Sequence, residues 1–227
     1  MRNNIICSFF IFIIGAYLIS QDFILPYKTW TIKNQANAWS SALYAFPVAP
    51  LSIKAPLLTL SIASFGLWAN STPAVNFVDV TSIFWVIIVV SIHVLPGAKH
   101  KNLVIYCIDG AFASAIATTL YLGYEHVALN YYQENLVPIT GIIMGISVAN
   151  TTSYYGNVRL YSVGTGLIVI GFGCKLLTIY YDQYWGTCVF HTSTAAGIAV
   201  LLSDKLTLET EHDKDNDNDG FVQFDGV

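Results

Sequence analysis

Residues 181–204, YDQYWGTCVFHTSTAAGIAVLLSD, contain the stretch that decides the fold class. The apolar run inside it is long enough to cross a bilayer, which requires about 20 helical residues. His191 lies about two helical turns inside the first end of this run. An ionisable side chain within a membrane segment is costly and marks a candidate functional site. The stretch therefore predicts a membrane helix and one candidate site residue.

The composition of the whole chain also favours a membrane protein. Of its 227 residues, 55% are hydrophobic and 11% are charged, whereas a soluble domain carries about 25% charged residues. The four cysteines all lie in apolar segments without a CxxC pair, which predicts buried free thiols. No basic patch is present, which argues against a nucleic-acid partner. We expect an integral membrane protein whose surroundings are membrane lipids.

The pattern of apolar segments predicts an all-α, multi-pass membrane helical bundle. Residues 1–20 suit either a signal peptide or an N-terminal transmembrane helix. Residues 21–38 are polar enough for an exposed, non-cytoplasmic segment, and residues 206–227 for an acidic, disordered cytoplasmic tail. Residues 39–205 form the expected seven-helix transmembrane domain. Its expected segments are 39–53, 56–70, 77–96, 102–123, 136–151, 158–180 and 185–203.

The positive charges predict how this bundle is oriented. Lys54, Lys99, Lys101, Arg159 and Lys205 fall in alternate loops, and loops rich in Lys and Arg stay on the cytoplasmic side. The C-terminus is then cytoplasmic, and residues 21–38 lie outside or in a lumen. The plasma membrane and the membranes of the secretory pathway both fit this orientation.

The same topology brings three polar residues to one membrane leaflet. Ser64 is expected near the outer end of its helix, and Asp79 and His191 near the outer beginnings of theirs. A helix rises about 1.5 Å per residue, so each should lie within about 10 Å of its helix end. Such a group could form a polar cage with a catalytic or metal-binding role, or could simply pair Asp79 with His191 to fix packing.

Two further charged residues fall inside expected helices. Asp109 lies toward the cytoplasmic half and Lys175 toward the outer half of the bilayer. We expect structural pairing or snorkelling of the side chain for both.

Three motifs resemble those of a known membrane family. Residues 77–86, FVDVTSIFWV, resemble the F-x-D-x-x-S motif of the third core helix in myomaker-like and transmembrane-protein-eight-like proteins. Residues 64–68, SFGLW, take the place of a Ser-x-x-x-His motif, and residues 182–191, DQYWGTCVFH, resemble the seventh-helix motif. These proteins belong to the CREST superfamily, together with alkaline ceramidases, progestin/adipoQ receptors and GPI-lipid remodelling proteins. The resemblance covers most of residues 37–205 and implies a seven-helix core.

The resemblance also implies a metal site, which this chain carries in altered form. In the superfamily three histidines bind zinc, and a serine and an aspartate surround it. Ser64, Asp79 and His191 match that pattern. Trp68 and Thr187 stand where the other two histidines belong. Indole cannot ligate zinc and a neutral hydroxyl is a poor ligand, so zinc would require a different set of donors.

Two functions follow, and both remain open at this point. The first is a non-enzymatic protein of membrane remodelling or fusion, like myomaker, acting with a protein partner or as a homo-oligomer. The second is a zinc-dependent lipid amidase or acyl hydrolase, in which His191, Asp79 and Cys188 hold the metal and Ser64 stabilises the oxyanion. The replacement of two histidines favours the first function, the non-enzymatic protein, which requires no cofactor. A transporter is disfavoured because no inverted repeat is visible.

The acidic tail contains one further motif. Residues 215–222, DNDNDGFV, match the beginning of an EF-hand loop, but Gly226 stands where the bidentate glutamate is expected. The two interpretations are weak calcium binding by Asp215, Asp217 and Asp219, and a solvated acidic tail, which is the usual role of such charge runs.

Overall fold

In the computed structural model, residues 2–24, 36–70, 72–94, 101–122, 158–181 and 185–218 are described, and all regular structure among them is helical. The all-α class is therefore confirmed for this part of the chain. The helices are α1 (Arg2–Ile24), α2 (Ala36–Ser41), the 3-10 turn η3 (Ala42–Ala45), α3 (Leu51–Ala69), α4 (Pro73–Val94), α5 (Lys101–Leu122), α8 (Val158–Tyr181) and α9 (Trp185–Asn218).

Five helices in the described ranges are long and apolar enough to cross a membrane. Their apolar windows are Asn3–Ser20, Leu51–Ala69, Ala74–Val94, Arg159–Thr178 and Trp185–Ser203. Each has the length that a hydrocarbon core requires of a helix. The fold is thus compatible with an integral membrane protein, as the composition predicts.

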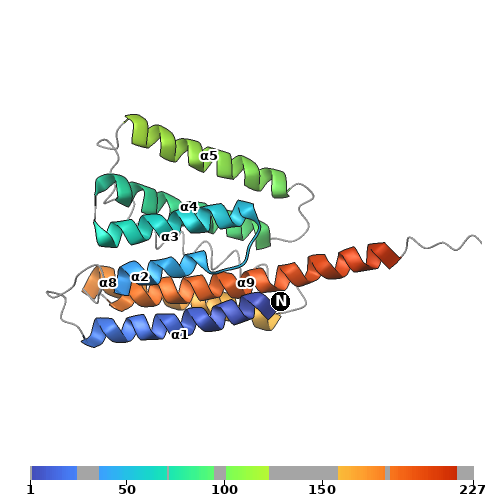
Figure 1. The fold of residues 1–227 in the computed structure, drawn as a ribbon, viewed down its shortest axis with the longest axis horizontal. Coiled ribbons are helices and arrows are strands. Elements are labelled where there is room, and N and C mark those ends of the chain that lie inside the picture. The colour runs from blue at the N-terminus through green and yellow to red at the C-terminus, as the bar shows by residue number, and fades with distance from the viewer. Residues whose placement is uncertain are drawn as a thin grey trace, which may run out of the picture.

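Helix α9 is the centre of the arrangement (Figure 1). It packs along α8 and α1 and also contacts α2 and α4. Of its window Trp185–Ser203, 94% is buried inside the protein. The hydropathy of this window is only moderate, because Thr, Ser and Gly stand among its apolar residues. Such small residues allow other helices to approach closely, which suits α9 to the central position.

The contact between α8 and α9 depends on glycine at one crossing. A Cβ atom added at Gly197 would lie 2.7 Å from the backbone oxygen of Gly164. A backbone atom cannot move aside as a side chain can, so the two helices meet at a distance that only glycine permits here.

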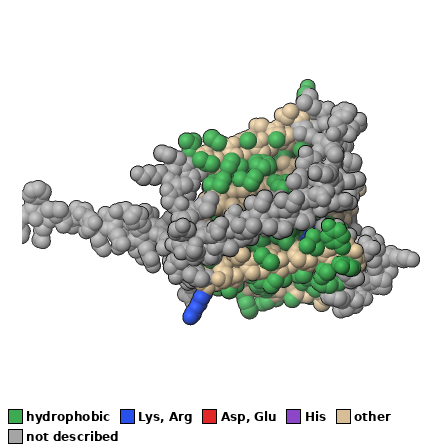
Figure 2. Space-filling model, turned by 180° about the vertical axis from the view of Figure 1, so that it is seen from behind, with side chains coloured by type: hydrophobic (Ala, Val, Ile, Leu, Met, Phe, Trp, Pro, Cys, Tyr) green, Lys and Arg blue, Asp and Glu red, His purple; other side chains and the backbone are tan. Residues whose placement is uncertain are grey.

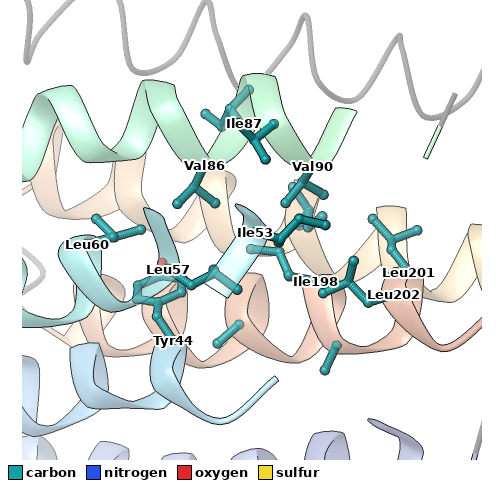
Figure 3. Close-up of a cluster of buried hydrophobic side chains, with 14 of the residues drawn as sticks. Tyr44, Ile53, Leu57, Leu60, Val86, Ile87, Val90, Ile198, Leu201 and Leu202 are labelled. Carbon is teal, nitrogen blue, oxygen red and sulfur yellow. The ribbon is translucent and has the colours of Figure 1, made fainter. Parts of the chain in front are cut away.

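The hydrophobic core lies where α3 and α4 face α9 (Figure 3). Ile53 and Leu57 of α3 are fully buried, and Val90 of α4 is fully buried too. Ile198 and Leu201 of α9 meet them in the same cluster. This packing joins the α3–α4 pair to the α1–α8–α9 group into one structure.

The exterior is apolar as well. Phe9 of α1 is 64% exposed, Ile62 of α3 73% and Tyr121 of α5 88%. In the view of Figure 2, hydrophobic side chains spread over the described surface, and no Asp, Glu or His side chain is visible on it. Contiguous exposed apolar surface of this kind suits contact with lipid rather than water.

The largest departure from the sequence-based expectation is at residues 39–53. Instead of a membrane-spanning segment, the chain forms α2 and η3 and then runs without regular structure to Pro50. Pro47 and Pro50 lack the N–H group that a continuous helix requires. The carbonyl oxygen of Pro47 accepts a hydrogen bond from the Lys54 ammonium group at 2.9 Å, in place of a helical N–H group.

Two other boundaries differ, and one expected segment lies outside the described residues. Residues 36–38, expected in an exposed segment, are buried in α2. Helix α9 extends to Asn218, through the first part of the tail expected to be disordered; Leu, Glu and Lys in this part favour helix. The expected segment 136–151 is among the residues that the structure leaves undescribed.

Candidate functional site

A buried polar site lies near one end of the helix bundle. Ser64 comes from the last part of α3, Asp79 from the beginning of α4 and His191 from the beginning of α9. Their side chains are 2%, 6% and 3% exposed. Buried polar groups require partners, so the chemistry of the site follows from which partners each of them has.

The imidazole of His191 lies between two serine hydroxyl groups. Its Nδ1 atom is 2.9 Å from Oγ of Ser40 in α2, and its Nε2 atom is 3.4 Å from Oγ of Ser64. The Ser40 hydroxyl donates to the carbonyl oxygen of Asn37 at 3.0 Å, so its oxygen is left to accept the proton of Nδ1. We infer that His191 is neutral with Nδ1–H as donor, which leaves Nε2 as an acceptor facing the Ser64 hydroxyl.

The carboxyl group of Asp79 lies beside this pair. The Ser64 hydroxyl lies within hydrogen-bonding reach of it, and Lys175 and Tyr44 lie within range of its charge. Its Oδ1 atom is buried and has no hydrogen-bond partner among the described residues. Ser64 therefore has two possible acceptors for its one hydroxyl proton, the His191 ring and the Asp79 carboxylate. The expected group of hydroxyl, carboxylate and imidazole is brought together by α3, α4 and α9.

Lys175 of α8 brings a positive charge into the same site. Its Nζ atom donates to Oγ1 of Thr187 at 3.2 Å. The same atom lies 5.6 Å from the ring centroid of Trp68 and 5.9 Å from that of Phe190. Aromatic faces attract cations at such distances. The polar contact of this lysine is thus made with Thr187, and two aromatic rings lie beside its ammonium group.

Aromatic side chains close the site around His191. The ring of Tyr44 packs edge-on against the imidazole at a centroid distance of 5.8 Å, and Phe190 lies at 5.5 Å. The Tyr44 hydroxyl is 2.5 Å from Oγ1 of Thr194, one turn further along α9. These contacts anchor η3 to α9 and hold the histidine ring in place.

The donors needed for zinc are poorly represented here. Cys188 directs its sulfur toward the carbonyl oxygen of Ala36, at 3.9 Å. Both ring nitrogens of His191 have hydroxyl partners, and Thr187 already accepts a hydrogen bond from an ammonium group. Among the described residues no three His, Cys, Asp or Glu side chains form a metal-binding group. The donor set around His191 does not suit a zinc ion.

Some residues of the site were not predicted. Ser40, Asn37 and Tyr44 come from α2 and η3, where the sequence suggested a spanning helix. Residues 37–40, NAWS, carried one signal, because they resemble the entry to the first core helix of CREST proteins. Asp109, expected to pair structurally, accepts a hydrogen bond from Nε1 of Trp85 at 2.7 Å, away from the site.

A separate apolar groove of about 500 Å³ lies between α3 and α4 and reaches α5. It is lined by Thr59, Ile62, Ala63, Gly66, Ala74, Val75, Val78 and Leu120. None of these side chains belongs to the polar site.

Comparison with known proteins adds no relative: no protein-family model, curated protein or solved structure matches this chain. The resemblance to CREST proteins therefore stays a prediction that rests on the motifs.

Proposed function

We propose that this chain is a multi-pass integral membrane protein whose buried polar site is structural rather than catalytic. The observation that carries the proposal is the double contact of His191 with Ser40 and Ser64, at 2.9 Å and 3.4 Å. A histidine whose two nitrogens serve hydroxyls from two other helices connects three helices. Within a membrane such interhelical hydrogen bonds supply specificity that apolar contacts lack.

Helix α1 is proposed to remain in the mature protein. The side chain of Asn4 pairs with the backbone of Val48 through two hydrogen bonds of 2.8 Å and 3.0 Å. Ile11 is fully buried and α1 packs along α9. Removal of this helix as a signal peptide would expose these groups, so retention is the more favourable outcome.

The biological role that we propose is in membrane remodelling or fusion, through lipids and through a protein partner or a second copy of the chain. This part rests on the resemblance to myomaker-like proteins. The chain shares their serine, aspartate and one histidine, but it has Trp68 and Thr187 at the two remaining ligand positions. The orientation with a cytoplasmic C-terminus belongs to the same proposal.

The proposal is tested by measuring zinc and lipid turnover in detergent-purified protein. We expect far less than stoichiometric zinc by elemental analysis, and no hydrolysis of ceramide or acyl lipids. His191→Ala should alter stability and leave this lack of turnover unchanged. Stoichiometric zinc together with turnover that His191→Ala abolishes would contradict a structural role.

The alternative is a lipid amidase or acyl hydrolase with a shifted set of zinc ligands. One observation favours it: Ser64 touches His191 and lies beside Asp79, whose Oδ1 atom is buried without a hydrogen-bond partner among the described residues. A bound metal would supply an activated water at this end of the bundle. The same zinc and turnover measurements separate this enzyme from the structural protein.

A further inference from the structure

The apolar groove between α3 and α4 takes no part in the proposed function. Its volume of about 500 Å³ lies in the range of small-molecule sites, which is about 300–1,000 Å³. On α3 it is lined by Thr59, Ile62, Ala63 and Gly66, whose three- and four-residue spacing defines one helix face. Ser64 does not line it, so the groove and the polar site lie on different faces of this helix.

The described walls of the groove offer no polar partner to a ligand. Thr59 is the one lining residue with a polar side chain, and its hydroxyl group donates to the carbonyl oxygen of Ala55 in its own helix at 3.0 Å. A headgroup or an extended peptide placed here would therefore leave its own polar groups unpaired, which is costly away from water. The occupant that fits these walls is apolar.

The groove has the depth of one membrane leaflet. Thr59 lies ten residues before Ala69, the end of the α3 window, which is a distance of about 15 Å along a helix. Ala74, at the other side of the groove, is the first residue of the α4 window. The groove thus extends from the end of both spans to about the middle of a hydrocarbon core of about 30 Å.

We propose that this groove binds one acyl chain of a diacyl phospholipid from the surrounding bilayer. Left empty, its walls would lose the dispersion contacts that a close-packed neighbour provides. Acyl chains are the medium around an apolar exterior, and Ile62 at the edge of the groove is 73% exposed. The inference rests on the membrane-spanning part of the proposed function and is independent of the role of the polar site.

A protein helix is the other apolar occupant to consider, and the groove is too narrow for one. The lining residues of α3 from Thr59 to Gly66 cover about 10 Å of helix length. A volume of about 500 Å³ over this length gives a cross-section of about 50 Å². An α-helix with its side chains is about 10–12 Å wide and fills about 80–110 Å².

The bound chain would also support α5. In the view of Figure 1 this helix lies on the outside of the α3–α4 pair, and its main packing contacts are with α4. Leu120, near the end of α5, reaches the groove and is 44% exposed. An acyl chain between Leu120 and α3 therefore fills the space where these two helices have few direct contacts.

The inference is tested with the full chain in phosphatidylcholine vesicles that contain phosphatidylcholine with a diazirine in one acyl chain. After irradiation, mass spectrometry compares labelling at Ala63 and Val78 in the groove with labelling at Ile170, which is 56% exposed on α8. Ala74→Phe fills the groove, and Ala111→Phe, at an exposed position of α5, is the matched control. We expect the ratio of groove to Ile170 labelling to fall several-fold in the first variant only.

Two results would overturn the inference. A labelling ratio that Ala74→Phe leaves unchanged would mean that the label does not come from a chain in the groove. A native protein labelled at Ile170 but not at Ala63 or Val78 would mean that protein, such as a second copy, covers the groove. Neither result bears on the polar site, whereas zinc bound to the native protein would contradict the proposed function and leave the labelling ratio unaffected.

A second measurement needs no variant, so it does not depend on whether Ala74→Phe folds. The native protein is held in a sterol-based detergent, which has no acyl chain, and phosphatidylcholine is then added. We expect hydrogen exchange to slow in residues 117–121 of α5, beside the groove, and to stay the same in residues 162–170 of α8. Equal slowing in both segments would show that lipid coats the whole surface without a preferred site, and the inference would be wrong.

Discussion

Nδ1 of His191 lies 2.9 Å from Oγ of Ser40, although the two residues are 151 positions apart in the chain. This contact joins α2, a helix of six residues, to the central helix α9. So short a helix gains little stability from its own hydrogen bonds. Its place in the fold depends on side chains that connect it to α9, and those same side chains complete the environment of the histidine.

Ser64→Ala should destabilise the protein by about 1–3 kcal/mol, because it leaves a buried imidazole nitrogen without its partner. The measurement is equilibrium unfolding in detergent micelles. Thr59→Ala on the same helix is the matched control, since this half-buried hydroxyl donates to the carbonyl oxygen of Ala55 in its own helix. If both variants lose the same stability, the hydroxyl of Ser64 has no special role.

Tyr44→Phe should cost about 1 kcal/mol, because the buried hydroxyl contact with Thr194 is lost while the ring remains. The ring still packs on His191, so the fold should be retained. The control is Tyr106→Phe on α5, where the side chain is 62% exposed and little change in the unfolding midpoint is expected. A Tyr44→Phe variant as stable as this control would disprove the anchoring of η3 by its hydroxyl.

Gly197→Ala should lower stability by about 1–3 kcal/mol through overpacking. The new methyl carbon would lie 2.7 Å from the backbone oxygen of Gly164, so α8 and α9 must move apart. Gly173→Ala on α8 is the control, since nothing lies within 4 Å of its added Cβ atom. That variant should be neutral or more stable by up to about 1 kcal/mol, from helix propensity. If thermal unfolding shows that Gly197→Ala is more stable than Gly173→Ala, the close crossing of α8 and α9 is ruled out.

Asp109→Ala should loosen α5, whose main packing contacts are with α4. The carboxylate accepts the indole N–H of Trp85 at 2.7 Å, and a hydrogen bond to a charged group contributes about 1.5–3 kcal/mol. Hydrogen exchange should become faster in α5 and stay unchanged in α9. Asp109→Asn, which keeps an oxygen acceptor, should have a smaller effect. Unchanged exchange in α5 would mean that this hydrogen bond does not hold the helix.

Much of the helical architecture follows from the sequence because apolar length and punctuation are local signals. The segment expected at 56–70 corresponds to α3, and that at 158–180 to α8, within a few residues. The grouping of Ser64 with His191 also follows, because both lie near helix ends that the topology brings to one side. These predictions use only spacing along helices and the order of the segments.

The remaining features depend on tertiary contacts that no local pattern carries. Residues 39–53 are apolar enough for a helix, but Pro47 and Pro50 interrupt it and Asn4 of α1 binds the backbone at Val48. The contacts of Lys175 come from two other helices, α3 and α9, so its place inside the polar site is not visible in its own segment. Ser40 likewise becomes part of the site only because α2 turns toward α9.

The most direct test of the account is a mutant cycle between Ser40 and His191, measured by unfolding in detergent. Ser40→Ala and His191→Ala should each destabilise the protein, and the double variant should lose clearly less than the sum of the two, with a coupling free energy of about 1 kcal/mol or more. Effects that add to within about 0.5 kcal/mol would mean that the two side chains are energetically independent. His191 would then not be the structural link between helices that the account requires.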